Sequence, residues 1–460
     1  MITTTNPATG EAIAEYETLD DNGIDAKLEA ATRAYRDWRT SPMDTRTQIL
    51  SALGDLYERN KEDLARLAVT EMGKPITQAR AEVEKCASLF HYFAESGPAM
   101  LEPREWKLSD GGRAEGRWLP LGPVLAVMPW NFPYWQVVRF LAPTILAGNT
   151  GLLKHASIVQ GVAARMEELV LEAGAPEGLF QNLCVSSDPI GKVIDDSRIV
   201  AATLTGSEGA GSAVAERAGK NLKKVVLELG GSDPFIVMPS ADIEQAVKDA
   251  VTARIQNNGQ SCICGKRTIV HADIYDEFAD RFIAALKDVK IGDPMEDDTE
   301  LGPLSSEGQR DTVLDQVEKA REEGCTLVFG AQKMDRPGAW MTPGLLTDVP
   351  LAGDTGTDEI FGPVAQLYKA KDIEEATTIA NAIPYGLGSA VWTRDADEMD
   401  HFAKSIEAGM TTFNAVNGSR IEAPFGGIKR SGHGRELSEF GLHEFMNLKT
   451  IVYPAQEKSA

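Results

Sequence analysis

The chain has 460 residues and a formal charge of -23, and 43% of its residues are hydrophobic, 25% charged and 7% aromatic. This length predicts two or three domains, and the composition is typical of a folded globular protein and excludes a disordered one. Because the negative field repels nucleic acid and anionic lipid, we expect neither as a partner.

The N-terminal segment has no basic stretch followed by an apolar run, so no signal peptide is predicted. No window approaches the ~18 uninterrupted apolar residues of a membrane span. The expected location is therefore cytoplasmic, with no membrane partner. The five cysteines are an odd number and are thinly spread, which predicts reduced thiols and no disulfide framework.

The hydrophobic pattern changes along the chain. Residues 25–105 have apolar side chains three and four apart, which predicts amphipathic helices. From about 120 to 205, and again from about 233 to 415, apolar runs alternate with helical segments. Such alternation predicts two doubly wound α/β domains with parallel sheets. Two strand-like segments, 112–120 and 447–454, stand apart and are either edge strands or an arm between subunits.

The first apolar run of the α/β pattern ends in PWNFP, residues 129–133. The two prolines fix the backbone around Asn131 and hold its amide in place. An amide held in this way can donate a hydrogen bond to an oxyanion. Alternatively, the segment is only a rigid turn.

The helix predicted over 134–146 carries Trp135 and Arg139 four residues apart, and so on one face. Arginine is the preferred partner of a carboxylate because its planar fork binds both oxygens. Arg139 therefore either binds an anionic ligand or belongs to an ordinary salt bridge.

A dinucleotide site is suggested by RIVAATLTGSEGAG, although the chain lacks a G-x-G-x-x-G motif. A strand ends at Gly206 and Ser207 and a helix then begins. The N–H groups and the positive end of the helix dipole would face a pyrophosphate. Taken alone, the segment is also compatible with an ordinary helix cap.

An acid interrupts an apolar strand at Glu228, in LELGG, residues 227–231. A carboxylate buried there is costly unless it is paired or protonated. A pKa raised toward neutrality suits a general base, although a structural ion pair is the alternative.

A thiol follows a Gly-Gln turn in NNGQSCICGKR, residues 257–267. Structural cysteines usually sit within an apolar pattern, whereas the flanks of Cys262 are polar and turn-forming. We therefore expect an accessible sulfur that acts as a nucleophile. With Glu228 and Asn131 it completes a set of nucleophile, base and oxyanion donor, which suits acyl chemistry.

These segments resemble the signature motifs of the aldehyde dehydrogenase superfamily over nearly the whole chain. The motifs, in the family's order, are PWNFP, LKHAS, LTGS, LELGG, GQSC, EIFGP and PFGGIKRSGHGRE. The resemblance implies an α/β fold with a cofactor-binding domain over 1–110 and 124–229 and a catalytic domain over 230–425. It also implies a small β oligomerisation arm, formed by 111–123 and 436–456, in a homodimer or homotetramer.

The resemblance also implies roles for individual residues. Cys262 would attack the aldehyde, Glu228 would activate the water that cleaves the resulting thioester, and Asn131 would help form the oxyanion hole. The implied dinucleotide-binding residues, with no metal, are Trp130, Lys154, Ser157, Gly206, Ser207, Glu359 and Phe361. NAD-preferring relatives commonly carry Glu where this chain has Ser157, and a small hydroxyl near Lys154 accepts a 2′-phosphate. NADP is therefore expected in preference to NAD.

Substrate choice is also implied by resemblance. Arg139 and Ser419 match residues that bind the distal carboxylate in succinate semialdehyde dehydrogenases, and Trp135 is expected to line the same tunnel. The sequence is most similar to the short-form, NADP-dependent members of that group. Long-form members have a second arginine where this chain has Gln256. Glutarate semialdehyde or a medium-chain aliphatic aldehyde is therefore an alternative substrate.

Two other activities and one regulatory role remain open at this point. An acylating dehydrogenase would resolve the thioester with coenzyme A, which would leave Glu228 without a role. A non-catalytic binding protein of the same fold would not need Cys262, Glu228 and Asn131. Cys264 resembles the redox-sensitive position of some family members, so it is either a redox partner of Cys262 or a small core residue.

Overall fold

The computed structural model describes residues 1–455, and its first hundred or so residues form a short hairpin followed by helices. An antiparallel hairpin of β1 (Ile2–Thr5) and β2 (Ala12–Tyr16) comes first. Four helices follow: α1 (Asp21–Trp38), α2 (Met43–Arg59), α3 (Lys61–Met72) and α4 (Ile76–Met100). The predicted helical region was too long, because α4 ends at Met100 and a strand begins at Arg104. Pro103 explains the difference, since a proline disfavours helical backbone in the residue before it.

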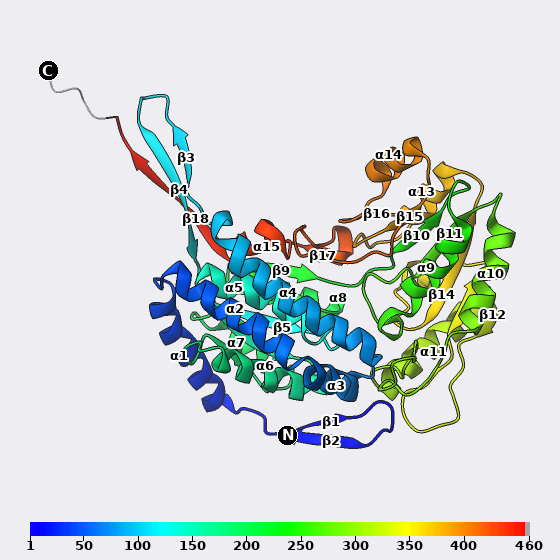
Figure 1. Cartoon of the computed structure of the whole chain (residues 1–460), viewed down its shortest axis with the longest axis horizontal. Helices are drawn as coiled ribbons and strands as arrows, with labels where there is room; N and C mark the ends of the chain where they lie inside the picture. The colour runs from blue at the N-terminus through cyan, green and yellow to red at the C-terminus, as the bar shows by residue number, and fades with distance from the viewer. Residues whose placement is uncertain (456–460) are drawn as a thin grey trace.

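The turn of the N-terminal hairpin contacts the second half of the chain. The Pro7 carbonyl accepts a hydrogen bond from the Ala339 N–H at 2.8 Å, and the Ala8 carbonyl accepts one from Trp340 Nε1 at 2.9 Å. Gly338 has a φ of +92°, and a Cβ there would lie 2.5 Å from the Pro7 oxygen. Figure 1 shows the hairpin running past α3 toward the second lobe. The hairpin therefore connects both lobes of the molecule.

The first lobe contains a six-stranded sheet in the order β17-β9-β8-β5-β6-β7. Its strands are β5 (Pro123–Met128), β6 (Thr150–His155), β7 (Phe180–Asn182), β8 (Ala201–Thr205), β9 (Lys224–Glu228) and β17 (Gly432–His433). The helices that follow its strands are α5 (Trp135–Ala147), η1 (Ser157–Val159), α6 (Gln160–Glu172), α7 (Ile190–Asp195) and α8 (Glu208–Lys220). Strands β5 to β9 are parallel, as predicted, whereas β17 returns from the second lobe and pairs antiparallel with β9.

The second lobe contains a seven-stranded sheet in the order β12-β13-β14-β11-β10-β15-β16. Its strands are β10 (Pro234–Val237), β11 (Arg267–His271), β12 (Thr326–Gly330), β13 (Gly344–Thr347), β14 (Val364–Ala370), β15 (Ala390–Trp392) and β16 (Thr412–Phe413). Its helices are α9 (Ile243–Ile255), η2 (Gln256–Gly259), α10 (Tyr275–Lys287), α11 (Glu307–Glu322), α12 (Asp354–Thr357), α13 (Ile373–Asn381) and α14 (Ala396–Ser405). All neighbouring strands are parallel except β12 and β13. Neither β13 nor β14, both interior strands of this sheet, was predicted from the sequence pattern.

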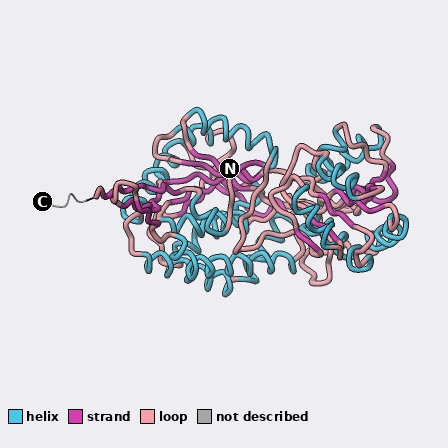
Figure 2. The backbone as a smooth tube through the Cα atoms, turned by 90° about the horizontal axis from the view of Figure 1, so that it is seen from above, coloured by secondary structure: helices cyan, strands magenta, loops and turns pink. Residues whose placement is uncertain are grey.

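A separate three-stranded antiparallel sheet is formed by β3 (Arg104–Lys107), β4 (Arg113–Pro120) and β18 (Met446–Tyr453). The short helix α15 (Ser438–His443) lies between β17 and β18, and the 3-10 turn η3 (Lys429–Ser431) directly precedes β17. Figures 1 and 2 both show this sheet projecting from one end of the molecule. Its strands carry exposed apolar side chains, among them Trp106 and Val452. Residue 456 of the arm expected from the sequence lies outside the described residues.

Among residues 1–455, no helix combines the length and the apolar character that crossing a membrane requires.

Candidate functional site

Two cavities meet near the carboxyl ends of β5, β8 and β9, where open parallel sheets usually bind ligands. The first, called here the strand-end cavity, has a volume of about 290 Å³ and is lined by residues that include Trp130, Asn131, Ser207, Glu228, Glu359 and Phe361. The second, the helix-side cavity, has a volume of about 590 Å³ and lies against α4, α5 and the end of α9. Cys262 and Gln136 line both cavities. The thiol therefore stands where the two cavities join.

The backbone before Cys262 is held in an unusual conformation. Asn257, Asn258 and Gly259 have φ angles of 53°, 58° and 74°, in the left-handed region that non-glycine residues rarely adopt. The Asn258 amide stabilises this turn by donating to the Gly73 carbonyl at 2.9 Å and to the Pro303 carbonyl at 2.8 Å. Both acceptors lie on other segments, so the turn is held in place from two sides.

The two cysteines of this loop differ in their surroundings. The Cys262 thiol lies on the cavity walls, and burial raises its pKa to about 12. It is therefore a neutral thiol at neutral pH and must lose a proton before it can act as a nucleophile. Cys264 is fully buried, and both cysteines are free thiols. The proposed pairing of the two remains a prediction, and it would require Cys264 to leave its buried position.

Lys266 connects the nucleophile loop to Glu359. Its ammonium donates to the Ser261 carbonyl at 2.6 Å and to the Cys262 carbonyl at 2.9 Å, and it forms an ion pair with Glu359 at 2.9 Å. Its positive charge also lowers the pKa of Cys262, in opposition to the larger effect of burial. Lys266 belongs to the NNGQSCICGKR segment, but no role for it was predicted from the sequence.

The Asn131 side chain lies beside the nucleophile loop, as its motif predicted. Its side-chain amide donates one hydrogen to the Gln260 carbonyl at 3.0 Å, and the backbone carbonyl of Asn131 accepts from the Asn257 side-chain amide at 2.7 Å. An asparagine amide has two hydrogens. The second is therefore left to donate into the strand-end cavity, which Asn131 lines.

Glu228 is the last residue of β9, and burial raises the pKa of its carboxyl well above the usual range. The negative charge of Glu436 raises that pKa further, whereas Arg139 and Arg435 lower it. Among the described residues, neither oxygen of Glu228 has a hydrogen-bond partner. Gly426, with a φ of +152°, leaves room for this carboxyl, because a Cβ there would lie 2.6 Å from Glu228 Oε1.

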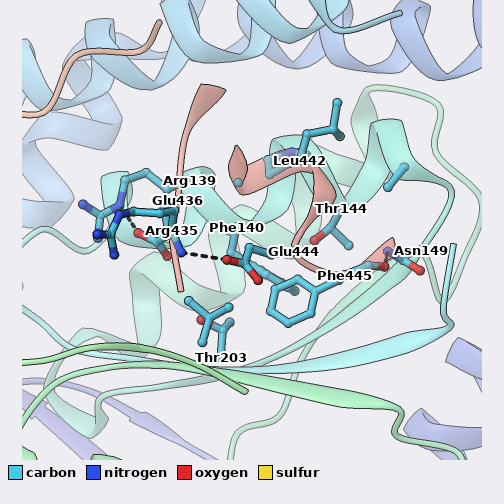
Figure 3. Close-up of a pocket in the computed structure, with 14 residues that line it drawn as sticks. Arg139, Phe140, Thr144, Asn149, Thr203, Arg435, Glu436, Leu442, Glu444 and Phe445 are labelled. Carbon is cyan, nitrogen blue, oxygen red and sulfur yellow. Dashed lines mark hydrogen bonds and ion pairs between the residues drawn. The ribbon is translucent and has the colours of Figure 1, made fainter. Parts of the chain in front are cut away.

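A second buried acid, Glu436, forms an ion pair with Arg139, with Nε and Oε2 2.7 Å apart. Burial raises the pKa of Glu436 as well, and Arg139 lowers it. Figure 3 shows this pair beside Arg435 and Glu444. The salt bridge expected as one alternative for Arg139 is present, and its side chain also lines the helix-side cavity, where binding of an anionic ligand stays a prediction. The sequence analysis did not foresee the acid that pairs with it.

The residues expected to bind a dinucleotide surround the strand-end cavity or lie at the same edge of the sheet. Trp130 and Phe361 form an edge-to-face pair with ring centroids 5.8 Å apart. Ser207 caps α8, where its side chain accepts from the Ala210 N–H at 3.4 Å. Lys154 and Ser157 do not line this cavity. They lie at the end of β6 and in η1, next to β5 in the sheet.

The residues expected to bind the substrate share the helix-side cavity. Trp135, Arg139 and Ser419 all line it, and so does Gln256. The N–H groups of Tyr134 and Trp135 donate to Glu82 at 2.8 and 2.9 Å, which fixes the start of α5. Lys85 also lines this cavity, although sequence reasoning had missed it.

The comparisons with known proteins agree over the whole chain. Residues 1–451 match the model of the aldehyde dehydrogenase family. The chain is 48% identical to succinate-semialdehyde dehydrogenase [NADP(+)] 1 of Mycobacterium tuberculosis over 98% of this chain and 99% of that protein. It is 47% identical to succinate-semialdehyde dehydrogenase [NADP(+)] of Mycobacterium leprae over the same shares. A crystal structure of succinic semialdehyde dehydrogenase from Streptococcus pyogenes in complex with NADP+ superimposes with a TM-score of 0.97, at 39% identity, over 99% of this chain and 100% of that one.

Proposed function

The chain belongs to the aldehyde dehydrogenase family, and we propose that it oxidises succinate semialdehyde to succinate, with NADP preferred over NAD as electron acceptor. The observation that carries the proposal is the position of Cys262, which lines both the strand-end and the helix-side cavity. An aldehyde in one cavity and a dinucleotide in the other would both reach the same sulfur. The names of the mycobacterial and streptococcal relatives support this choice of substrate and cofactor.

The proposed chemistry assigns each step to a side chain. The Cys262 thiol releases its proton to solvent and the thiolate adds to the aldehyde carbon, while the free hydrogen of the Asn131 amide and the Cys262 N–H stabilise the oxyanion. A dinucleotide held by Trp130, Glu359 and Phe361 would supply the oxidation, as the acceptor of a hydride. Glu228 then takes a proton from water as the hydroxide adds to the thioester carbonyl. The bond to sulfur breaks, which releases the acid and the thiolate.

The strand-end cavity suits the nicotinamide half of a dinucleotide, and its lining extends to Gly206 and Ser207. At Gly230, a Cβ would lie 2.4 Å from Glu359 Oε2, so only glycine leaves that carboxylate its place in the cavity wall. We propose that Trp130, Glu359 and Phe361 hold the nicotinamide half, and that the N–H groups at Gly206 and Ser207 face the pyrophosphate. Lys154 and Ser157 would receive the ribose and its 2′-phosphate.

The substitution Ser157→Glu should shift the preference toward NAD. A carboxylate at this place would repel the 2′-phosphate and accept hydrogen bonds from free ribose hydroxyls. The ratio of kcat/KM with NADP to kcat/KM with NAD should fall by a factor equivalent to about 1–3 kcal/mol, the usual contribution of a charge-assisted contact. Ser88→Glu, at an exposed serine of α4, is the matched control. An unchanged ratio in Ser157→Glu would show that the phosphate binds elsewhere.

The substitution Arg139→Ala should reduce activity in two ways. It removes a cation from the helix-side cavity, so the loss on succinate semialdehyde should exceed the loss on butanal by about 2–4 kcal/mol. It also leaves Glu436 without its partner and raises the pKa of Glu228, so butanal oxidation should fall too. The measurement is kcat/KM for both aldehydes. Equal losses on the two substrates would leave Arg139 with a structural role only.

The exposed three-stranded sheet supports an assembly role, and we propose that it joins subunits into a homodimer or homotetramer.

The substrate test is an aldehyde panel assayed with NADP and NAD in parallel, in which production of reduced cofactor is followed. Succinate semialdehyde with NADP should give the highest kcat/KM. A higher value for glutarate semialdehyde or for an unbranched neutral aldehyde would overturn the substrate assignment. A requirement for coenzyme A would overturn hydrolysis.

A further inference from the structure

Lys85 is a partly buried cation inside the helix-side cavity. It lies on α4, one turn after Glu82, and both side chains line the cavity. Its ammonium donates to the Ser419 carbonyl at 2.7 Å and to the Ser419 hydroxyl oxygen at 2.8 Å. It also lies 4.4 Å from the centre of the Trp135 ring, a favourable place for a cation. Lys85 thus holds together the two other residues, Trp135 and Ser419, that line this part of the cavity.

Lys85 has no anionic partner within the described residues, because no carboxylate there lies within 4.0 Å of its ammonium. Arg139, the other cation of the cavity, is paired with Glu436. A buried charge with only neutral partners is unfavourable. An anionic ligand in the cavity would therefore gain more from Lys85 than from a cation that is already paired.

The acids that line the same cavity are already engaged with other groups. Glu82 pairs with Lys74 and accepts two backbone N–H groups at the start of α5. Asp297 pairs with Arg80, Asp298 pairs with Lys290, and Glu300 accepts from the Lys290 N–H at 2.8 Å. None of these acids neutralises Lys85. The unpaired charge on this wall is therefore positive.

Ser419 is left able to act with Lys85. Because its oxygen accepts from the Lys85 ammonium, the hydroxyl hydrogen is free to donate to another group. An ammonium has three donors, and Ser419 takes two of those on Lys85. One ammonium hydrogen and one hydroxyl hydrogen thus remain, which matches the two oxygens of a carboxylate.

We propose that Lys85, together with the Ser419 hydroxyl, binds the distal carboxylate of the aldehyde substrate and selects anionic aldehydes over neutral ones. This inference rests on the proposed function. It adds to Arg139 a second cation, contributed by α4, whereas Gln256, which lines the same cavity, contributes no charge. Lys85 is a specificity-determining residue in this account, since it contacts the part of the substrate that does not react.

The charge of Lys85 should make substrate selection depend on pH. Burial lowers its pKa to about 8, and the nearby cations Arg139 and Arg420 lower it as well, whereas Cys86 and Glu82 raise it. The ammonium form that binds a carboxylate is present below this pKa and is lost as the pH rises through it. The ratio of kcat/KM for succinate semialdehyde to that for butanal should therefore fall above about pH 8. Titrations of the reacting groups cancel in this ratio.

The test compares the wild type with Lys85→Met, Lys85→Arg and a matched control, Lys248→Met, at an exposed lysine of α9. Lys85→Met should lose about 10- to 100-fold in kcat/KM on succinate semialdehyde, as expected for one charged hydrogen bond, and should keep its activity on butanal. Butanal turnover also shows that the variant is folded. Lys85→Arg should retain the preference and lose the fall above about pH 8, because arginine stays protonated.

A second readout uses inhibition. Succinate should inhibit butanal oxidation competitively in the wild type, and its inhibition constant should rise about 10- to 100-fold in Lys85→Met. Equal losses of Lys85→Met on both aldehydes, or an unchanged preference and inhibition constant, would overturn the inference. A wild type that does not prefer succinate semialdehyde to butanal would instead overturn the proposed function, so the two failures are distinguishable.

Discussion

Cys262→Ala should abolish aldehyde oxidation, with a fall in kcat of about three orders of magnitude or more. The sulfur lies where the strand-end and helix-side cavities join, and alanine offers no group that can form the covalent intermediate. The loss should be similar for succinate semialdehyde and butanal, because both would react at the same atom. Steady-state production of reduced cofactor measures the effect.

The matched control is Cys184→Ala. It removes a partly exposed thiol that lines neither cavity, so turnover should be unchanged. Cys262→Ala should still bind NADP and should melt near the wild-type temperature, because its backbone turn is held by Asn258 and not by the thiol. Near-normal turnover of Cys262→Ala would remove this residue from the chemistry.

Glu228→Gln should slow steady-state turnover by about 10²- to 10⁴-fold, the usual contribution of a general base. Glutamine keeps the size of the side chain but cannot accept the proton of the attacking water. The acyl group should therefore accumulate on Cys262, and rapid mixing should show a burst of reduced cofactor followed by a slow phase. Intact-protein mass spectrometry of the slow phase should detect the acylated chain.

The control for this substitution is Glu177→Gln, at an exposed glutamate of the first lobe, which should behave as the wild type. Because burial raises the pKa of the Cys262 thiol to about 12, that thiol also needs a proton acceptor. A slow variant without a burst would identify Glu228 as that acceptor and would move its main role to acylation. Wild-type turnover of Glu228→Gln would contradict any role as a base.

Much of the fold and of the site could be predicted because both depend on local pattern. The alternation of apolar runs and helices predicted the two parallel sheets, and Asn131, Glu228 and Cys262 lie in short motifs with polar groups in unusual places. The antiparallel return of β17 to the first sheet could not be predicted in this way, since it depends on pairing between distant segments. The same is true of β14, because Gln366 and Lys369 interrupt its apolar sequence, although only Lys369 is exposed in the sheet.

The residues that sequence reasoning missed share a physical cause. Lys85 occupies an ordinary position in an amphipathic helix, and only the packing of α4 against the Ser419 loop brings its ammonium into a cavity. Glu436 gives no local signal either, because its partner Arg139 lies on α5. By contrast, the left-handed turn before Cys262 could have been predicted from the sequence, since Asn-Asn-Gly tolerates positive φ.

The contact between the N-terminal hairpin and the second lobe has a mechanical consequence. The chain passes between the lobes after β9 and returns before β17, and these two strands are neighbours in one sheet. Two adjacent crossings would act as a hinge axis about which the lobes could rotate. The hydrogen bonds from Ala339 and Trp340 go to the turn of the N-terminal hairpin, and Figure 1 shows this hairpin at the bottom of the view, away from β9 and β17. They form a third connection between the lobes, so they would restrain such a rotation and limit the relative movement of the site residues that the two lobes contribute.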